Sequence, residues 1–394
     1  MVLVDLWQKK SQNIAVKINV IITMIDYKEL AVKGVQKLSP YIPGKPISEL
    51  EREMGISNIV KLASNENPLG SSPMAMKAMS DTLNEIELYP DGNGFELKKV
   101  LAAKHNIEMD QITLGNGSND VLVLLTEAFL SPKQNAVYSQ YCFAVYPIAI
   151  QAVGAIHKQI PALGWDSPSP LGHDLDAMLA AIDDNTRLVF VANPNNPTGN
   201  HLSETELKGF IAKIPEHVIV IVDEAYLEYS SIEEQVDASA WLGEFPNLVV
   251  TRTFSKAYGL AGLRVGYALS NPDIANVINR IRQPFNVNSL ALIAAEHAVS
   301  DIEFLERSLL ENSLGMNILE NTCQKLGLRY VPSKGNFLLV DFERDASNIY
   351  MDLLKSGIIT RPVANYGLTD CLRITIGTQE QMKRLDQSME KVCG

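Results

Sequence analysis

Short apolar runs alternate with longer amphipathic stretches from about residue 110 onward. The apolar runs predict strands at 136–139, 188–192, 218–222, 248–252 and 265–270. The stretches between and around them predict helices at 120–130, 175–181, 204–214 and 274–282. Residues 218–222 read VIVIV, which is typical of a strand buried on both faces. The pattern therefore predicts an α/β fold with a mostly parallel sheet between helices.

The pattern changes beyond Pro284. Residues 288–327 predict one long helix, and the runs at 335–342 and 371–377 predict strands of a smaller α+β domain. We expect an N-terminal arm (24–66) that joins this small domain (293–394), and a large domain between them (67–292). Residues 14–25 are apolar but too short to span a bilayer. Residues 1–23 are expected to be a disordered extension or an artefact of the assigned start.

Composition narrows the class of function. The 394 residues include 34 Lys+Arg and 46 Asp+Glu, a net charge of -12 that argues against a nucleic-acid surface or a polybasic membrane patch. A few arginines in a cleft could still attract a small anionic substrate. The four cysteines form no CxxC pair, which favours a reducing cytoplasmic setting. The six histidines form neither HExxH nor HxH, so no protein-built metal site is predicted.

Polar segments follow three of the predicted strands. NPNNPTG occupies 193–199, DEAY occupies 223–226 and TFSKAYG occupies 253–259. In open α/β sheets, ligands bind beyond the carboxyl ends of the strands, so these segments should converge. A fourth segment, GNGSND (115–120), precedes a helix. It is either an anion site at a helix N-terminus or a plain helix start capped by Ser118 or Asn119.

Pyridoxal phosphate would use all of these groups. It needs a lysine for a Schiff base, which Lys256 can supply, and an acid beside its pyridine nitrogen, which Asp223 can supply. Its ring oxygen needs donors such as Tyr226 and Asn196. Its phosphate needs an anion cradle, for which the candidates are Gly117, Ser118, Asn119, Ser255 and Arg264.

NPNNPTG, DEAY and SKAYGLAGLRVGY, in this order and spacing, resemble the fold-type I aminotransferases over roughly residues 27–394. LSPYIPGKP (38–46), LASNENPLG (62–70), YPDG (89–92), GNGSND and CLRITIGT (371–378) resemble the histidinol-phosphate aminotransferase family in particular. The resemblance implies a large domain with a seven-stranded sheet. It also implies transamination of L-histidinol phosphate with 2-oxoglutarate, which gives imidazole acetol phosphate and L-glutamate in histidine biosynthesis.

The resemblance also implies roles for individual residues. Lys256 matches the Schiff-base lysine, Asp223 the partner of the pyridine nitrogen, and Asn196 and Tyr226 the pair at the ring oxygen. The phosphate cradle matches the candidates named above, and the aromatic stacked on the ring matches Phe143, with Tyr146 as a second candidate. Tyr89 matches a tyrosine that reaches the partner subunit's phosphate, which implies a homodimer with shared sites. The implied substrate-binding residues are Tyr41, Asn67, Arg361 and Arg373.

Three alternatives remain from the sequence. An aromatic-amino-acid aminotransferase of the same family is one, because arginines that hold a phosphate can also hold a carboxylate. A threonine-phosphate-type decarboxylase shares similar motifs. A non-enzymatic regulator on this fold would need a DNA-binding module, and the sequence contains no basic winged-helix segment.

Overall fold

The structure is a computed structural model that describes residues 25–40 and 44–394. The predictions for residues 1–23 and for Tyr41 lie outside the described residues. Within these ranges, no helix is long and apolar enough to cross a membrane. The same residues contain no cluster of three or more His, Cys, Asp or Glu side chains that could bind a metal ion.

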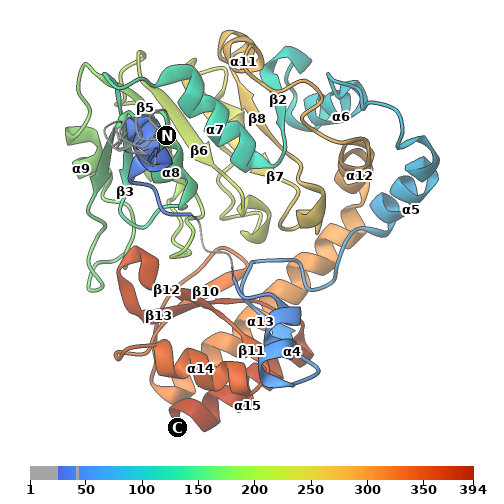
Figure 1. Cartoon of the computed structure of the whole chain (residues 1–394), viewed down its shortest axis with the longest axis vertical. Coiled ribbons are helices and arrows are strands. Elements are labelled where there is room, and N and C mark those ends of the chain that lie inside the picture. The colour runs from blue at the N-terminus through green and yellow to red at the C-terminus, as the bar shows by residue number, and fades with distance from the viewer. Residues whose placement is uncertain (1–24, 41–43) are drawn as a thin grey trace, which may run out of the picture.

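A seven-stranded sheet lies at the centre of the larger part of the molecule, with helices around it (Figure 1). Its spatial order is β2 (Ile112–Gly115), β8 (Gly266–Ser270), β7 (Leu248–Thr253), β6 (Ile219–Asp223), β5 (Thr186–Ala192), β3 (Asn135–Ser139) and β4 (Ile156–Ile160). β8 runs antiparallel to both of its neighbours, and the remaining pairs are parallel. The predicted α/β fold with a mostly parallel sheet is confirmed.

The inner strands of this sheet are buried on both faces, as the VIVIV run of β6 predicted. Leu188 and Phe190 of β5 pack in a core with α7 (Ser118–Phe129), α8 (Val145–Ala152) and α11 (Pro272–Asn279). Val189 and Val191 of the same strand belong to a core on the other face. That core includes α5 (Pro73–Thr82), α6 (Phe95–His105), α9 (Leu175–Ala180), α10 (Glu204–Ile211) and α12 (Ser289–Ser300). The alternation follows from the period of two in a strand.

The sequence patterns located five of the seven strands and missed β2 and β4. β4 is largely exposed and carries His157, Lys158 and Gln159, so it lacks the apolar run that marks a buried strand. The expectation of one helix over 288–327 is wrong, because α12 and α13 (Ile302–Leu326) meet at Asp301. The Asp301 carboxylate accepts the backbone N–H of Phe304 at 3.2 Å and thereby starts a new helix.

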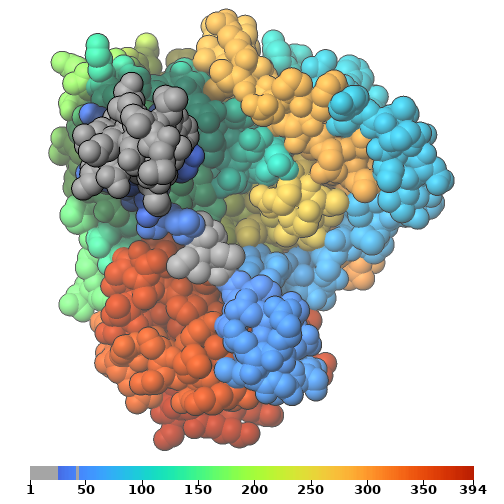
Figure 2. Space-filling model, viewed as in Figure 1, coloured from blue at the N-terminus to red at the C-terminus, as the bar shows by residue number. Residues whose placement is uncertain are grey.

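A second, antiparallel sheet lies beside the first, in the order β12 (Arg361–Val363), β13 (Leu368–Thr375), β10 (Phe337–Asp341) and β9 (Arg329–Val331). It packs with the later part of α13, with α14 (Ser347–Lys355) and with α15 (Gln379–Cys393). The N-terminal arm joins this unit, since β1 (Val60–Lys61) pairs with β11 (Ile358–Ile359). Leu50 of α4 (Ile47–Met54) packs on Leu354 and Ile359 there, and α4 covers this side of the unit in Figure 2. The domain boundaries near residues 66 and 292 stay a prediction.

Candidate active site

The polar segments that follow β5, β6 and β7 converge on one cavity of about 120 Å³. Its walls also include the start of α7, Phe143 before α8 and Arg264 before β8. The lining residues are Ser118, Asn119, Phe143, Ala192, Pro194, Asn196, Asp223, Ala225, Tyr226, Thr253, Ser255, Lys256 and Arg264. In the NPNNPTG segment, the Asn193–Pro194 and Asn196–Pro197 bonds are both cis. Parallel strands present their carboxyl ends at the same edge, so the sheet itself brings these groups together.

Lys256 contributes a half-buried amine to this cavity. Its Nζ donates to the backbone carbonyl of Ser64 at 3.3 Å. Burial lowers the pKa of Lys256 to about 7, aided by the positive charges of Arg373 and Arg264 and opposed by Glu66 and Asp223. A lysine with this pKa is partly neutral near pH 7, so its amine can act as a nucleophile and as a base.

Asp223 ends β6 and is 5% exposed. Tyr146 donates its hydroxyl to Oδ2 at 2.7 Å, and Thr251 donates to Oδ1 at 3.2 Å. Burial raises the pKa of Asp223 above its ordinary value, while these two hydrogen bonds and the charge of Lys256 oppose the rise. The Asp223 carboxylate therefore accepts hydrogen bonds from two neutral hydroxyl groups and forms no ion pair with them. Its negative charge can interact with a cationic group in the cavity.

The segment before α7 forms an anion cradle. Gly117 is the N-cap residue at φ 87°, and no side chain caps the helix there. Ser118 and Asn119 lie at the first turn, where backbone N–H groups and the helix dipole favour an anion. Arg264 donates from Nη1 to Ser255 Oγ at 3.2 Å, and a Cβ at position 117 would lie 2.6 Å from Nη2 of Arg264. Glycine is thus required for the guanidinium to approach the helix start.

Tyr226 lies where this cavity meets a second one of about 120 Å³. Its hydroxyl accepts a hydrogen bond from Asn196 Nδ2 at 3.2 Å and another from Asn65 Nδ2 at 2.9 Å. Asn196 in turn accepts a bond from Arg373 Nη1 at 2.6 Å. A continuous polar chain therefore runs from the large sheet to β13 of the second sheet.

Arg361 and Arg373 lie opposite each other in the register of β12 and β13, and both line the second cavity. Arg373 also donates to the carbonyl of Ala63 at 2.8 Å. Two guanidinium groups on adjacent strands, next to the lysine, suit the anionic end of a substrate.

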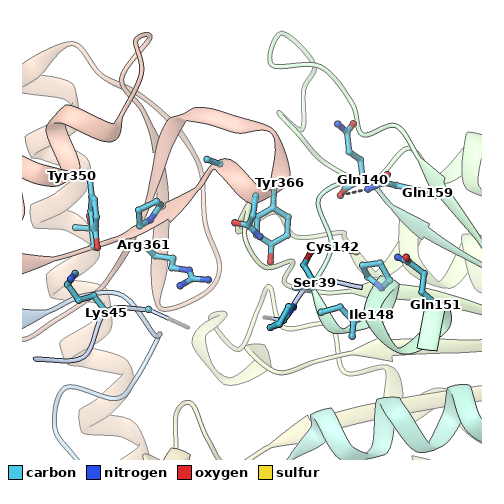
Figure 3. A pocket seen from close by; sticks show the side chains of 18 of the residues that line it. Ser39, Lys45, Gln140, Cys142, Ile148, Gln151, Gln159, Tyr350, Arg361 and Tyr366 are labelled. Carbon is cyan, nitrogen blue, oxygen red and sulfur yellow. Dashed lines mark hydrogen bonds between the residues drawn. The ribbon is translucent and has the colours of Figure 1, made fainter. Parts of the chain in front are cut away.

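A larger cavity of about 1040 Å³ adjoins the second one, with which it shares Gly44 and Arg361. In Figure 3, Arg361, Lys45 and Tyr350 lie on one side of it, and Gln140, Gln151 and Gln159 lie on the other. The cavity thus lies between the two sheets and provides room for a substrate beyond Arg361.

The structure separates the two aromatic candidates. Phe143 lines both smaller cavities, whereas Tyr146 is 1% exposed, stacks on Phe190 and bonds Asp223. Three other predicted residues do not line the two small cavities: Gly117, which is the N-cap residue of α7, Asn67 and Tyr89. Asn67 donates to the carbonyl of Ala257 and to Ser308, and Tyr89 is 82% exposed and stacks on Phe285.

Sequence reasoning missed three residues that shape the site. Thr251 bonds Asp223, Ser64 accepts from Lys256, and Asn65 bonds Tyr226. Thr251 lies within the predicted strand 248–252, two residues before the TFSKAYG segment begins. Its position opposite Asp223 on the neighbouring strand was therefore a signal that the sequence offered. Asn65 and Ser64 lie in the LASNENPLG motif but about 160 residues or more from their partners, so no local signal marks them.

The donor set fits pyridoxal phosphate. The cradle offers a helix start, Ser255 and Arg264 to a phosphate, and a side chain at Gly117 would displace the Arg264 guanidinium. A carboxylate, an amine and a phenol occupy the same cavity at the positions of Asp223, Lys256 and Tyr226. The carboxylate suits the pyridine nitrogen of the cofactor, the amine suits its aldehyde, and the phenol suits its ring oxygen.

Comparison with known proteins agrees with this geometry. Residues 57–388 match the family described as aminotransferase class I and II. A Pseudomonas fluorescens protein named histidinol-phosphate aminotransferase 2 is 55% identical over 93% of this chain and 98% of its own length. Histidinol-phosphate aminotransferase 1 of Mannheimia succiniciproducens is 52% identical over 93% and 98%. The crystal structure of the Sinorhizobium meliloti histidinol-phosphate aminotransferase with pyridoxal-5'-phosphate superposes with a TM-score of 0.82, at 27% identity over 91% of this chain and 96% of that one.

Proposed function

The chain belongs to the class I and II aminotransferases, which use pyridoxal phosphate, and from this we propose that it transfers the amino group of L-histidinol phosphate to 2-oxoglutarate. The products would be imidazole acetol phosphate and L-glutamate, in histidine biosynthesis. The observation that carries the choice of substrate is the pair Arg361 and Arg373 on adjacent strands beside Lys256. The names of relatives at 52–55% identity support it.

Each residue of the site has a proposed task. When bound, pyridoxal phosphate supplies an electron-withdrawing ring that stabilises negative charge on the substrate's α carbon. Lys256 would hold the cofactor covalently and, once released by the substrate, would move a proton to and from that carbon. Asp223 would keep the pyridine nitrogen protonated, and Phe143 would stack on the ring. Asn196 and Tyr226 would donate to the ring oxygen, while Ser118, Asn119, Ser255 and Arg264 would hold the phosphate.

The substrate assignment is tested with Arg361→Ala and with two substrates, histidinol phosphate and histidinol. Charge-assisted hydrogen bonds contribute about 1.5–3 kcal/mol, so kcat/KM for histidinol phosphate should fall by about tenfold or more. The loss should appear mainly in KM, because Arg361 would bind the phosphate equally in the ground and transition states. Histidinol, which lacks the phosphate, should lose much less.

Arg329→Ala is the matched control, because Arg329 lies on β9 of the same sheet and pairs with Asp341 instead of lining the cavities. Arg329→Ala should leave kcat/KM unchanged for both histidinol phosphate and histidinol. Equal losses for both substrates in Arg361→Ala would contradict a phosphate-binding role. Faster turnover of phenylalanine than of histidinol phosphate by the unmodified enzyme would favour the aromatic-aminotransferase alternative.

We propose a homodimer with shared active sites, supported by an exposed apolar group around Tyr89. Ile86, Leu88, Tyr89, Phe95 and Phe285 are 46–82% exposed. A mixture of Lys256→Ala and Tyr89→Ala chains tests sharing, because a mixed dimer would contain one intact site. After subunit exchange, about a quarter of all sites should be intact, although each parent is impaired. No recovery in a mixture that demonstrably exchanges subunits would exclude shared sites.

We also propose a cytoplasmic location. All four cysteines are unpaired in the structure, and three of them are buried. Free thiols are typical of reducing compartments.

A further inference from the structure

Asn65 connects the second sheet to the active-site tyrosine. It lies between β1 and α5, is 1% exposed and has a left-handed backbone conformation with φ 55°. Asparagine tolerates this conformation better than most residues, but it remains uncommon outside glycine. A buried polar side chain in such a conformation needs bonding partners, and the partners of Asn65 come from both parts of the molecule.

Three hydrogen bonds fix Asn65 to the second sheet and to the loop before it. Thr375 of β13 donates to Asn65 Oδ1 at 2.9 Å and accepts the backbone N–H of Asn65 at 2.9 Å. Asn336 donates to the backbone carbonyl of Asn65 at 3.0 Å. Because Oδ1 must face the threonine hydroxyl, the orientation of the amide is determined, and Nδ2 faces the opposite way.

Nδ2 of Asn65 donates to Tyr226 Oη at 2.9 Å, and Asn196 Nδ2 donates to the same oxygen at 3.2 Å. A phenol oxygen has two lone pairs and one proton. Two donated bonds occupy the lone-pair directions and therefore determine where the tyrosine O–H points. Asn196 also bonds Arg373 of β13, so both amides that face Tyr226 are linked to that strand.

We propose that Asn65 is a positioning residue that aims the Tyr226 hydroxyl and couples its direction to the position of β13. The inference rests on the proposed function, in which this hydroxyl donates to the ring oxygen of the cofactor. Asn65 lines the second cavity, and it would influence the reaction through its hydrogen bond to Tyr226.

The test uses the holoenzyme without substrate and follows the cofactor's visible absorbance as a function of pH. Asn65→Gly removes the amide, and glycine accepts the left-handed backbone without strain, so the fold should be retained. If the Tyr226 hydroxyl no longer points at the ring oxygen of the cofactor, more negative charge stays on that oxygen. This charge raises the pKa of the nitrogen that links Lys256 to the cofactor. The absorbance midpoint should rise by about one pH unit, the scale of one hydrogen bond.

Thr375→Val should shift the midpoint in the same direction by less, because it loosens Asn65 without removing the amide. Tyr226→Phe should shift it at least as far as Asn65→Gly. In the Tyr226→Phe background, Asn65→Gly should add no further shift. The charged groups that line the two cavities stay unchanged throughout: Asp223, Lys256, Arg264, Arg361 and Arg373.

Asn247→Gly is the matched control. Asn247 is a buried asparagine, 7% exposed, whose amide donates to the backbone carbonyl of Val218 at 2.8 Å and which lines neither small cavity. It should lower thermal stability and leave the midpoint in place. An unmoved midpoint in folded Asn65→Gly would overturn the proposal, as would an equal shift with and without Tyr226. Because no substrate is present, a wrong choice of substrate cannot produce either result.

Discussion

Asp223 and Glu224 are neighbours in sequence, both are buried, and their surroundings differ in kind. Asp223 accepts bonds from the neutral hydroxyls of Tyr146 and Thr251 and faces the cavity. Glu224 points to the other face of the sheet and forms an ion pair with Arg252 at 2.7 Å. The charge of Glu224 is neutralised by the guanidinium of Arg252, so this pair has a structural role. The charge of Asp223 is stabilised only by hydroxyl groups, so it can still pair with a cationic ligand.

The group around Glu224 is a closed polar network. Arg252 bonds Asp237 at 2.5 Å as well, and the backbone N–H of Ala238 donates to Glu224 at 2.7 Å. Burial works against the charge of Arg252, but Glu224 and the other anions around it raise its pKa above the usual value. Thr251 and Arg252 are adjacent on β7, so one strand serves both regions.

Removing the reactive amine should have the largest effect. Lys256→Ala should reduce transamination by more than about 10⁴-fold, because it removes both the proposed covalent anchor and the proposed proton carrier. The variant should stay folded and should lose the borohydride-reducible link to the cofactor. Lys256→Arg should not rescue it, since a guanidinium stays charged. A reducible link that persists in Lys256→Ala would reject this assignment.

The two carboxylates should separate activity from stability. Asp223→Asn should lower kcat by about 10²–10³-fold, the scale of one lost electrostatic partner, without destabilising the apoenzyme. Arg252→Met should lower the free energy of unfolding by about 3–5 kcal/mol, because it leaves Glu224 buried and unpaired. Turnover assays and denaturant titrations of both variants test the contrast. If Arg252→Met lowers kcat of the folded enzyme as much as Asp223→Asn does, the two regions are not distinct.

The decline of kcat at low pH (the acid limb of the pH profile) should follow the protonation of Lys256. Its pKa of about 7 means that the neutral base is lost as pH falls below 7, so kcat should decline there. Glu66 opposes the lowering of this pKa, so Glu66→Gln should move the acid limb to lower pH. Arg373→Gln should move it to higher pH, because a neighbouring positive charge is removed. Shifts in the opposite directions would show that another group controls the limb.

The sequence predicted most of the sheet and the residues that end its strands, for a physical reason. A carboxylate at the end of the VIVIV run and a lysine after the next strand must lie at one edge, because parallel strands share that edge. Asn65 could not be found in this way, since its bond to Thr375 spans 310 residues. The break at Asp301 was also missed, because a single capping aspartate interrupts an otherwise continuous helical pattern. The roles assigned to the cavity residues stay predictions.

The smallest expected effect concerns how Asp223 is held. Tyr146→Phe removes the 2.7 Å bond to Oδ2 and should lower kcat by about tenfold, because one hydrogen bond to a charged group is lost. The pKa of Asp223 should rise further, which would weaken its proposed interaction with the protonated ring nitrogen of the cofactor. Tyr138→Phe is the control, since Tyr138 is equally buried but bonds His157 on β4. If both variants behave alike, the loss comes from packing in the shared core, and the hydroxyls around Asp223 do not set its charge.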